Sequence, residues 1–133
     1  MKKLILILLL LFVAQSFAEQ SPERDPTRSL FPPDKIMENS EELGLTQEQK
    51  KEVHEIVQKL QPKLMEYQEE LQDSQKLVSK ALSVYPTSFS KVEPFLRSMF
   101  QEEGEMKLLH IKMLLEVRNI LSAEQVEILK SIK

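Results

Sequence analysis

The clearest hydrophobic pattern in the chain begins after Thr46 and continues to Tyr85. Apolar residues recur there at alternating steps of four and three positions, with Ser74 as the one polar member, at Val53, Val57, Leu60, Leu64, Tyr67, Leu71, Val78, Ala81 and Tyr85. This spacing places them on one face of an α-helix, and that face needs a second helix to cover it. Pro62 lies inside the series and lacks the N–H that would bond to the carbonyl of Gln58, so we expect a kink or a break there.

A second series with the same steps predicts a second long helix, with its buried face formed by Phe89, Val92, Leu96, Met99, Glu103, Met106, His110, Met113, Val117 and Ile120. Pro86 separates the two series. Neither proline nor the residue before it favours helix, so the chain should turn at Pro86. The two helices are therefore expected to pair as an antiparallel hairpin of residues 46–84 and 88–120.

Shorter helical segments flank this hairpin. Residues 34–43 should form a short helix that ends at Gly44, because glycine accepts the left-handed conformation that often follows a helix. Residues 122–133 should form a short final helix that faces inward through Val126, Leu129 and Ile132. No segment alternates as a strand. The predicted fold class is all-α, a long antiparallel helical hairpin with short flanking helices. So slender a hairpin is expected to form a cradle-like dimer.

Two near-copies of one pentapeptide mark where two of these helices begin. They are Leu45-Thr46-Gln47-Glu48-Gln49 and Leu121-Ser122-Ala123-Glu124-Gln125, 76 positions apart. Each is typical of a capping box, in which the hydroxyl accepts from the N–H three residues on and the glutamine side chain reaches back. Capping boxes are common, so coincidence is the simple alternative. The shared leucine and the shared Glu-Gln make the repeat more informative, and its motif residues are Leu45, Thr46, Gln49, Leu121, Ser122 and Gln125.

The N-terminus has the three parts of a secretory signal peptide. A basic start at residues 1–3 precedes an unbroken apolar run over residues 4–13, and small residues Ser16 and Ala18 predict cleavage after Ala18. A membrane anchor is the alternative, but ten apolar residues are too few to span a bilayer core, which needs about 20. We therefore expect export to the periplasm, with no stable membrane insertion after residues 1–18 are removed.

The rest of the chain divides into a lead-in and one helical domain, residues 34–133. Residues 19–33 contain four prolines among charged residues and only two large apolar ones, so a flexible lead-in is predicted. Loss of the leader removes two lysines and no acid, which changes the formal charge from −3 to −5. This acidic balance argues against nucleic acid as a partner. The absence of cysteine excludes disulfides, thiolate metal sites and cysteine nucleophiles.

Few residues could carry chemistry, and no catalytic motif is present, so an enzyme is not expected. His110 lies on the predicted buried face with Glu103 two turns before it and Met113 three residues after it. Imidazole with thioether suits copper, and imidazole with carboxylate suits zinc or nickel. The alternative is core methionine and a hydrogen-bonded histidine. A turn at Pro86 would leave His54 and His110 roughly 13 Å out of register, so they could not share one ion within a protomer.

With its signal peptide, its helical cysteine-free chain and its two Leu-Thr/Ser-x-x-Gln-type motifs, the sequence resembles the Spy/CpxP family over about residues 33–133. That family comprises periplasmic proteins of the bacterial envelope-stress response, with relatives in zinc and nickel/cobalt resistance. The resemblance implies a curved dimeric cradle that binds unfolded proteins without ATP, or a protein that tunes a sensor kinase. Two features depart from it. Spy-like cradles are basic, and the metal-sensing relatives carry an H-x-x-x-H pair where this chain has His54 and Gln58.

The leading hypothesis is a periplasmic homodimer, without cofactor, that acts as a chaperone or stress modulator by binding unfolded envelope proteins or a sensor kinase. Surplus apolar side chains would form its binding surface, or equally the dimer contact: Met65, Phe95, Phe100, Leu108 and Ile111. The alternative is a periplasmic heavy-metal sensor or resistance protein that binds zinc, nickel or copper through His110, Glu103 and Met113. A purely structural envelope component is a third reading.

Overall fold

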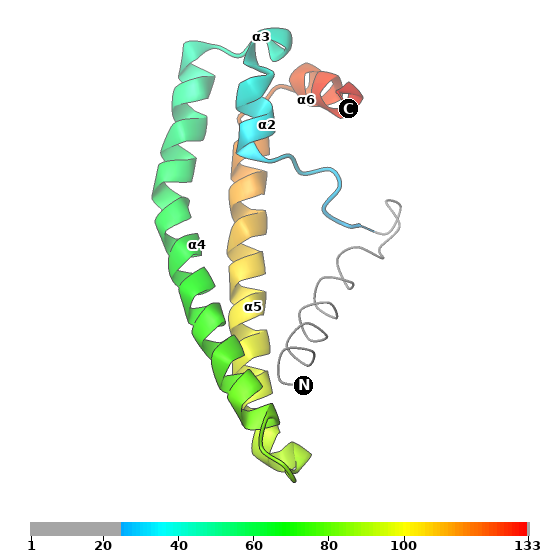
Figure 1. Ribbon diagram of the computed structural model, residues 1–133. Helices are drawn as coiled ribbons and strands as arrows, with labels where there is room; N and C mark the ends of the chain where they lie inside the picture. The colour runs from blue at the N-terminus through cyan, green and yellow to red at the C-terminus, as the bar shows by residue number, and fades with distance from the viewer. Residues whose placement is uncertain (1–24, 133) are drawn as a thin grey trace.

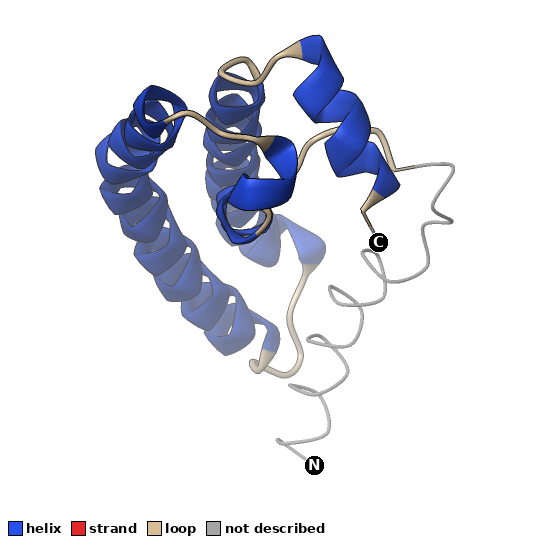
Figure 2. Cartoon of the chain, turned by 90° about the horizontal axis from the view of Figure 1, so that it is seen from above, coloured by secondary structure: helices blue, strands red, loops and turns tan. Residues whose placement is uncertain are grey.

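The computed structural model describes residues 25–132, so the predicted signal peptide and residues 19–24 lie outside the described part. The described residues form five helices in chain order: α2 (Pro33–Glu38), α3 (Ser40–Leu43), α4 (Gln47–Leu82), α5 (Phe89–Arg118) and α6 (Ala123–Ser131). Two of them are long and run side by side, and the three short ones gather at one end (Figure 1). No strand occurs within residues 25–132 (Figure 2), and the prediction of an all-α hairpin with short flanking helices is confirmed.

The seam between α4 and α5 follows the predicted periodicity. Its buried residues are Val53, Leu60, Leu71, Ser74 and Val78 from α4, with Val92, Met99, Met113, Leu114 and Val117 from α5. The chain reverses over residues 83–88, as predicted at Pro86. The two predicted members nearest the turn, Tyr85 and Phe89, are exposed instead of buried. Because α4 ends at Leu82, Tyr85 no longer follows the helical period, and Phe89 begins α5 where α4 no longer covers it.

Pro62 does not break α4. The helix runs without interruption from Gln47 to Leu82, and Figure 1 shows it as one gently curved ribbon. Gln58 and Pro62 are both exposed, so the carbonyl that loses its partner belongs to a part of the helix that water reaches. A proline costs least where water can replace the missing hydrogen bond. Of the predicted kink or break, the break is wrong, and the missing bond is accommodated on the solvent side.

A compact core closes the open end of the hairpin. It joins the two long helices to the three short ones through Phe31, Ile36, Leu43, Leu45, Val53, Val117, Leu121 and Leu129. The segment predicted as one helix over residues 34–43 is divided at Asn39 into α2 and α3. Gly44 ends α3 in the left-handed conformation with φ 65°, which is the predicted glycine stop. Burial of these apolar faces is what holds the short helices in place, since each is too short to be stable alone.

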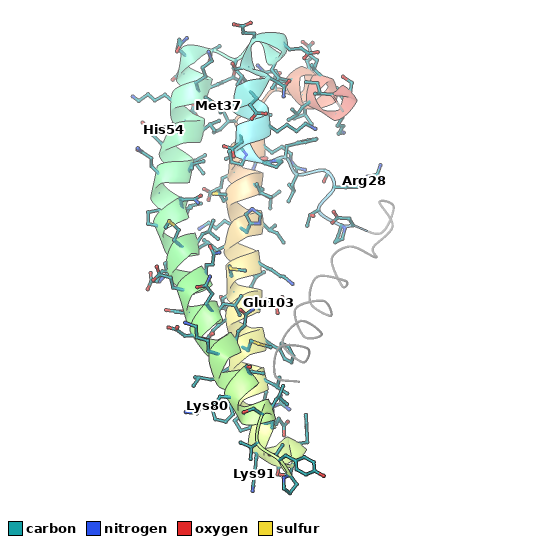
Figure 3. All side chains as sticks on the ribbon, viewed as in Figure 1. Arg28, Met37, His54, Lys80, Lys91 and Glu103 are labelled. Atoms are coloured by element: carbon teal, nitrogen blue, oxygen red, sulfur yellow. The ribbon has the colours of Figure 1, made fainter. Side chains whose placement is uncertain are left out.

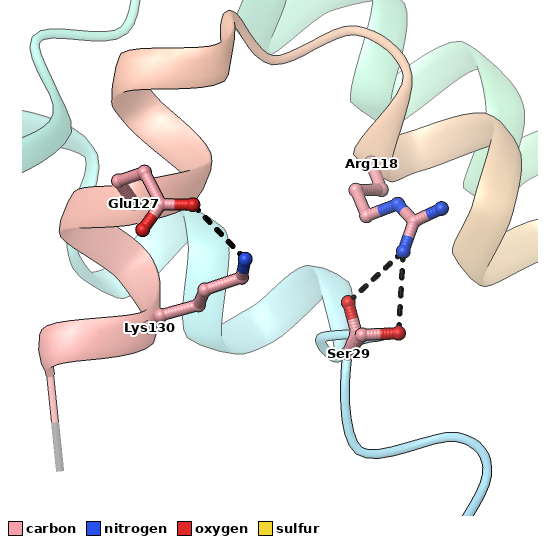
Figure 4. A network of polar contacts seen from close by, with 4 residues as sticks. All are labelled: Ser29, Arg118, Glu127 and Lys130. Carbon is pink, nitrogen blue, oxygen red and sulfur yellow. Dashed lines mark hydrogen bonds and ion pairs between the residues drawn. The ribbon is translucent and has the colours of Figure 1, made fainter.

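Part of the segment predicted as a flexible lead-in is docked on this core, at Ser29 and Phe31. Phe31 is buried in the core, and Nη1 of Arg118 donates to the carbonyl and the hydroxyl of Ser29 at 3.2 and 3.4 Å (Figure 4). The Thr27 hydroxyl and N–H donate to the Asp25 carboxylate, and these bonds lower the pKa of that carboxyl. One buried phenylalanine contributes about 2 kcal/mol. Composition did not predict this contact, because the segment as a whole has few apolar residues and, among those that the structure describes, only Phe31 is buried.

Candidate protein-binding surface and the paired motifs

Both repeated motifs form the capping boxes expected from the sequence. The Thr46 hydroxyl accepts from the Gln49 N–H at 3.0 Å, and the Gln49 side chain accepts from the Thr46 N–H at 3.0 Å. Ser122 and Gln125 make the same two bonds at 3.2 and 2.9 Å. The first box begins α4 and the second begins α6. Each satisfies backbone N–H groups that a helix leaves without partners in its first turn.

The two glutamines also bond to each other, a relationship that the sequence reasoning missed. Nε2 of Gln49 donates to Oε1 of Gln125 at 2.8 Å, and Nε2 of Gln125 donates to Oε1 of Gln49 at 3.1 Å. Each amide nitrogen also donates to a backbone carbonyl. Nε2 of Gln49 donates to the Ile120 carbonyl at 3.1 Å, and Nε2 of Gln125 donates to the Leu43 carbonyl at 3.2 Å. All hydrogen-bonding positions of both carboxamides are used. A glutamine repeated at the same place in both motifs was the signal that could have suggested the pairing.

The motif leucines complete this structure, because Leu45 and Leu121 are both buried in the open-end core. We call the six residues the motif junction: Leu45, Thr46, Gln49, Leu121, Ser122 and Gln125. The motif junction ties the start of α4 to the connection between α5 and α6 and to the end of α3. Its polar atoms are occupied in holding helices together, so its role in the described structure is to fix their relative orientation.

Three of the five predicted binding residues share one outer face of α5. Phe100, Leu108 and Ile111 lie at spacings that return to the same side of a helix, and Leu115 continues the line. Phe100 is 58% exposed and Leu108 is 64% exposed, and neither belongs to a core cluster of the described residues. We call these four residues the outer α5 stripe. An exposed apolar line on a rigid helix is typical of a surface that binds another protein.

The other two predicted binding residues lie elsewhere. Phe95 is five residues before Phe100, which places it about 140° around the helix. Met65 is on α4 and is exposed. The five residues therefore do not form a single surface within one protomer. For Met65 the spacing along the chain gave no information, because the outward directions of α4 and α5 depend on how the hairpin twists.

A shallow groove between α4 and α5 adjoins the stripe at Leu108. It is lined by Lys63, Tyr67, Glu105, Leu108, Leu109 and Lys112. Nζ of Lys63 lies 5.0 Å from the centre of the Tyr67 ring and donates to Glu66 at 2.9 Å. The bond to Glu66 raises the pKa of the Lys63 ammonium, which therefore stays charged at neutral pH. The groove thus offers an aromatic ring, two leucines, two lysines and one carboxylate beside the outer α5 stripe.

Two of the three candidate metal ligands, His110 and Glu103, do not converge within the described chain, and the third, Met113, is buried in the seam. His110 is exposed, although the periodicity placed it on the buried face, because the seam passes through Leu109 between Met106 and Met113. Glu103 pairs with Lys107 at 2.9 Å and lies seven residues from His110, roughly 10 Å along the helix. Figure 3 shows Glu103 on α5 and His54 on α4, toward the open end. Within residues 25–132, no three histidine or carboxylate side chains are placed to hold one metal ion.

Comparison with known proteins gives one match. Residues 4–127 match the model of a protein family described as heavy-metal resistance. No curated protein and no solved structure matches the chain. None of the helices in the described part is long and apolar enough to cross a membrane.

Proposed function

The chain belongs to the heavy-metal resistance family, and from this premise we propose that it works in the bacterial periplasm as a helical binding protein of the envelope-stress response. Its partners would be unfolded envelope proteins or a sensor kinase. The family is one of the Spy/CpxP-like periplasmic families, so the resemblance inferred from the repeated motifs is confirmed. Its partners, its periplasmic location and its homodimeric state are what we propose beyond the family.

The observation that carries this proposal is the outer α5 stripe. Phe100 and Leu108 keep more than half of their surface exposed on a hairpin whose seam and open-end core are already filled by other residues. A contiguous exposed apolar surface on a small protein often marks an interaction site. The adjoining groove would accept an apolar side chain of a partner against Tyr67, Leu108 and Leu109. Binding of this kind requires no nucleotide and no bond-making chemistry, which accords with a non-enzymatic role.

A rigid scaffold supports the proposal further. The motif junction and the open-end core hold α4 and α5 in one arrangement, so the stripe is presented without first ordering a flexible segment. In the proposed form the leader is removed after Ala18, and two copies associate so that part of the apolar surface is covered and the rest binds partners. Since the mature chain is net acidic, contact of apolar surfaces would dominate over charge attraction. Added salt would then weaken binding only modestly.

The test is suppression of aggregation of an unfolded protein by the purified mature chain, without nucleotide. The double variant Phe100→Ser/Leu108→Ser should lose the activity, because it removes the two most exposed stripe residues. Met37→Ser is the matched control, since Met37 is also an exposed apolar side chain but lies on α2 at the open end. A compact monomer in sedimentation, together with no delay of aggregation at stoichiometric protein, would reject the proposal.

The family match favours a second candidate, a heavy-metal sensor or resistance protein that binds zinc, nickel or copper. His110 is exposed, whereas Met113 is buried in the seam and Glu103 lies two turns away and pairs with Lys107, so we propose that a site of these residues would need a second copy. Titration of the mature protein with each metal tests this. Tight binding that His110→Ala abolishes, in a chain that does not suppress aggregation, would put the sensor in place of the first proposal.

A further inference from the structure

The turn of the hairpin carries the two most exposed large hydrophobic side chains of the described residues, Tyr85 and Phe89. Tyr85 is 96% exposed, Phe89 is 70% exposed and Val84 is 57% exposed, with Leu77 and Leu82 also uncovered. All residues from Leu82 to Lys91 are exposed. We call residues 76–91 the hairpin tip. It lies at the end of the molecule opposite α2, α3 and α6 (Figure 1).

The hairpin tip is basic, although the chain as a whole is acidic. It contains Lys76, Lys80 and Lys91, and no acidic residue occurs between Asp73 and Glu93. Figure 3 shows Lys80 and Lys91 at this end of the hairpin. The two bordering carboxylates are already paired, Asp73 with Lys76 at 3.9 Å and Glu93 with Arg97 at 2.6 Å.

Two of the cations are left for a partner, because within residues 25–132 neither Lys80 nor Lys91 forms an ion pair. The short helices α2 and α3 at the opposite end are acidic, since together they carry four acidic residues and one lysine. The molecule is therefore polarised in charge along its length. An anionic surface would attract the tip and repel the open end.

From this arrangement we infer that the hairpin tip is a docking site for the surface of an anionic phospholipid bilayer. Tyr85, Phe89 and Val84 enter the interfacial layer, while Lys80 and Lys91 contact the phosphate headgroups. Tyrosine and phenylalanine side chains favour that layer. Each lysine near an anionic surface adds to the electrostatic attraction between the protein and the lipid.

The shape of the tip favours a bilayer over a protein as the occupant. A turn of six residues between two helix ends is a narrow convex surface, whereas stable protein interfaces bury about 800 Å² on each partner. Interfacial binding to lipid needs no such area, because each inserted side chain contributes separately. The backbone of residues 83–88 is not helical, and its polar groups need water, so only side chains enter and the attachment is shallow and reversible.

This docking differs from insertion across the membrane and does not depend on the proposed function, since it uses no residue of the outer α5 stripe. At 1.5 Å per residue, α4 would hold the motif junction roughly 50 Å above the lipid. The stripe would then remain accessible to proteins along the side of the upright hairpin.

Co-sedimentation of the mature protein with vesicles tests the inference. Vesicles of phosphatidylcholine with about 30 mol% phosphatidylglycerol should bind the protein, vesicles of phosphatidylcholine alone should not, and salt should weaken the binding. Lys80→Gln/Lys91→Gln should lose roughly 30-fold in affinity, about fivefold for each lysine. Tyr85→Ala/Phe89→Ala should lose at least about tenfold, because two exposed rings no longer enter the interface.

Matched controls come from the rest of the hairpin. Phe100→Ala removes a ring that is 58% exposed from the middle of α5, and Lys51→Gln/Lys59→Gln removes two exposed cations from α4. Both should bind anionic vesicles like the unaltered protein. Because all variants share the same N-terminus, a difference between them reports only the altered side chains.

Three outcomes would overturn the inference. The first is failure to bind anionic vesicles, and the second is binding that both tip variants retain. The third is a tip variant that changes a dimer into a monomer, or that loses capture of a protein while vesicles never bind, because the tip would then be a contact between proteins. Aggregation suppression by the unaltered protein without lipid is measured separately, so failure at the membrane and failure of the proposed function are distinguishable.

Discussion

The side-chain amides of Gln49 and Gln125 hydrogen-bond to each other in both directions, at 2.8 and 3.1 Å, across 76 positions of sequence. Each amide also closes the capping box of its own helix, so one pair of side chains joins the starts of α4 and α6. Gln125 is buried and further bonds to the carbonyl of Leu43. The repeated motif is therefore a junction between helices as well as a pair of local caps.

Replacing Gln125 by alanine should lower the free energy of unfolding by about 1–3 kcal/mol, because it leaves the Gln49 amide and the Leu43 carbonyl without their partner. Gln49→Ala should have a smaller effect, since Gln49 is only partly buried. Urea denaturation of the two single variants and the double variant measures the coupling, expected at about 0.5–3 kcal/mol. Gln58→Ala, at an exposed position of α4, is the control. Strictly additive effects would show that the amide pair contributes nothing of its own.

The caps themselves predict a second set of stabilities. Thr46→Ala and Ser122→Ala should each cost about 0.5–2 kcal/mol, because the helix loses the hydroxyl that accepts from its first turn. Ser88 provides a matched control, since it is the N-cap residue of α5 but its side chain makes no cap hydrogen bond. Ser88→Ala should leave the denaturation midpoint nearly unchanged. If Thr46→Ala and Ser122→Ala also keep the denaturation midpoint of the unaltered protein, the two caps do not contribute to stability.

The docked lead-in predicts that Phe31 stabilises the helical domain. Phe31→Ala should lower the free energy of unfolding by about 3 kcal/mol, near the lower end for a buried phenylalanine, because the site lies at the edge of the core. Phe100→Ala is the control, an exposed phenylalanine whose removal should have little effect on stability. The measurement is thermal or urea unfolding. If Phe31→Ala leaves the free energy of unfolding unchanged, Phe31 does not anchor the lead-in, and the flexible segment predicted from composition stands.

Local features of the sequence were sufficient for the long helices, the turn and the caps. The four-and-three spacing decides which residues of α4 are buried, and a proline between two such series decides where the chain reverses. The glycine stop at Gly44 is equally local.

Features that depend on helix twist or on contacts between distant residues were not predictable from the sequence. His110 lies on the periodic line but is exposed, because Leu109 beside it gains more from burial than an imidazole would. The reach of Gln49 to Gln125 and the docking of Phe31 require the folded open end. For the candidate surface, the predicted set puts Phe95 with Phe100, Leu108 and Ile111, although helical spacing separates it from them, and spacing gives no basis for placing Met65 relative to α5.

The last prediction concerns Glu102, which lies three residues after Met99 and four before Met106 and so on the same side of α5 as these two residues. Its Oε2 atom is buried and accepts no hydrogen bond from the described residues, while Oε1 is 3.5 Å from the Ser98 hydroxyl. A buried oxygen without a partner costs about 1–3 kcal/mol. Glu102→Leu should therefore raise the free energy of unfolding by a comparable amount, because the leucine would join the apolar cluster of Leu71, Val78 and Met99. Glu105→Leu, at an exposed position one turn on, should be nearly neutral in the same urea titration. A loss of stability in Glu102→Leu would mean that the carboxylate has a partner in solution, such as a cation or a second copy of the chain.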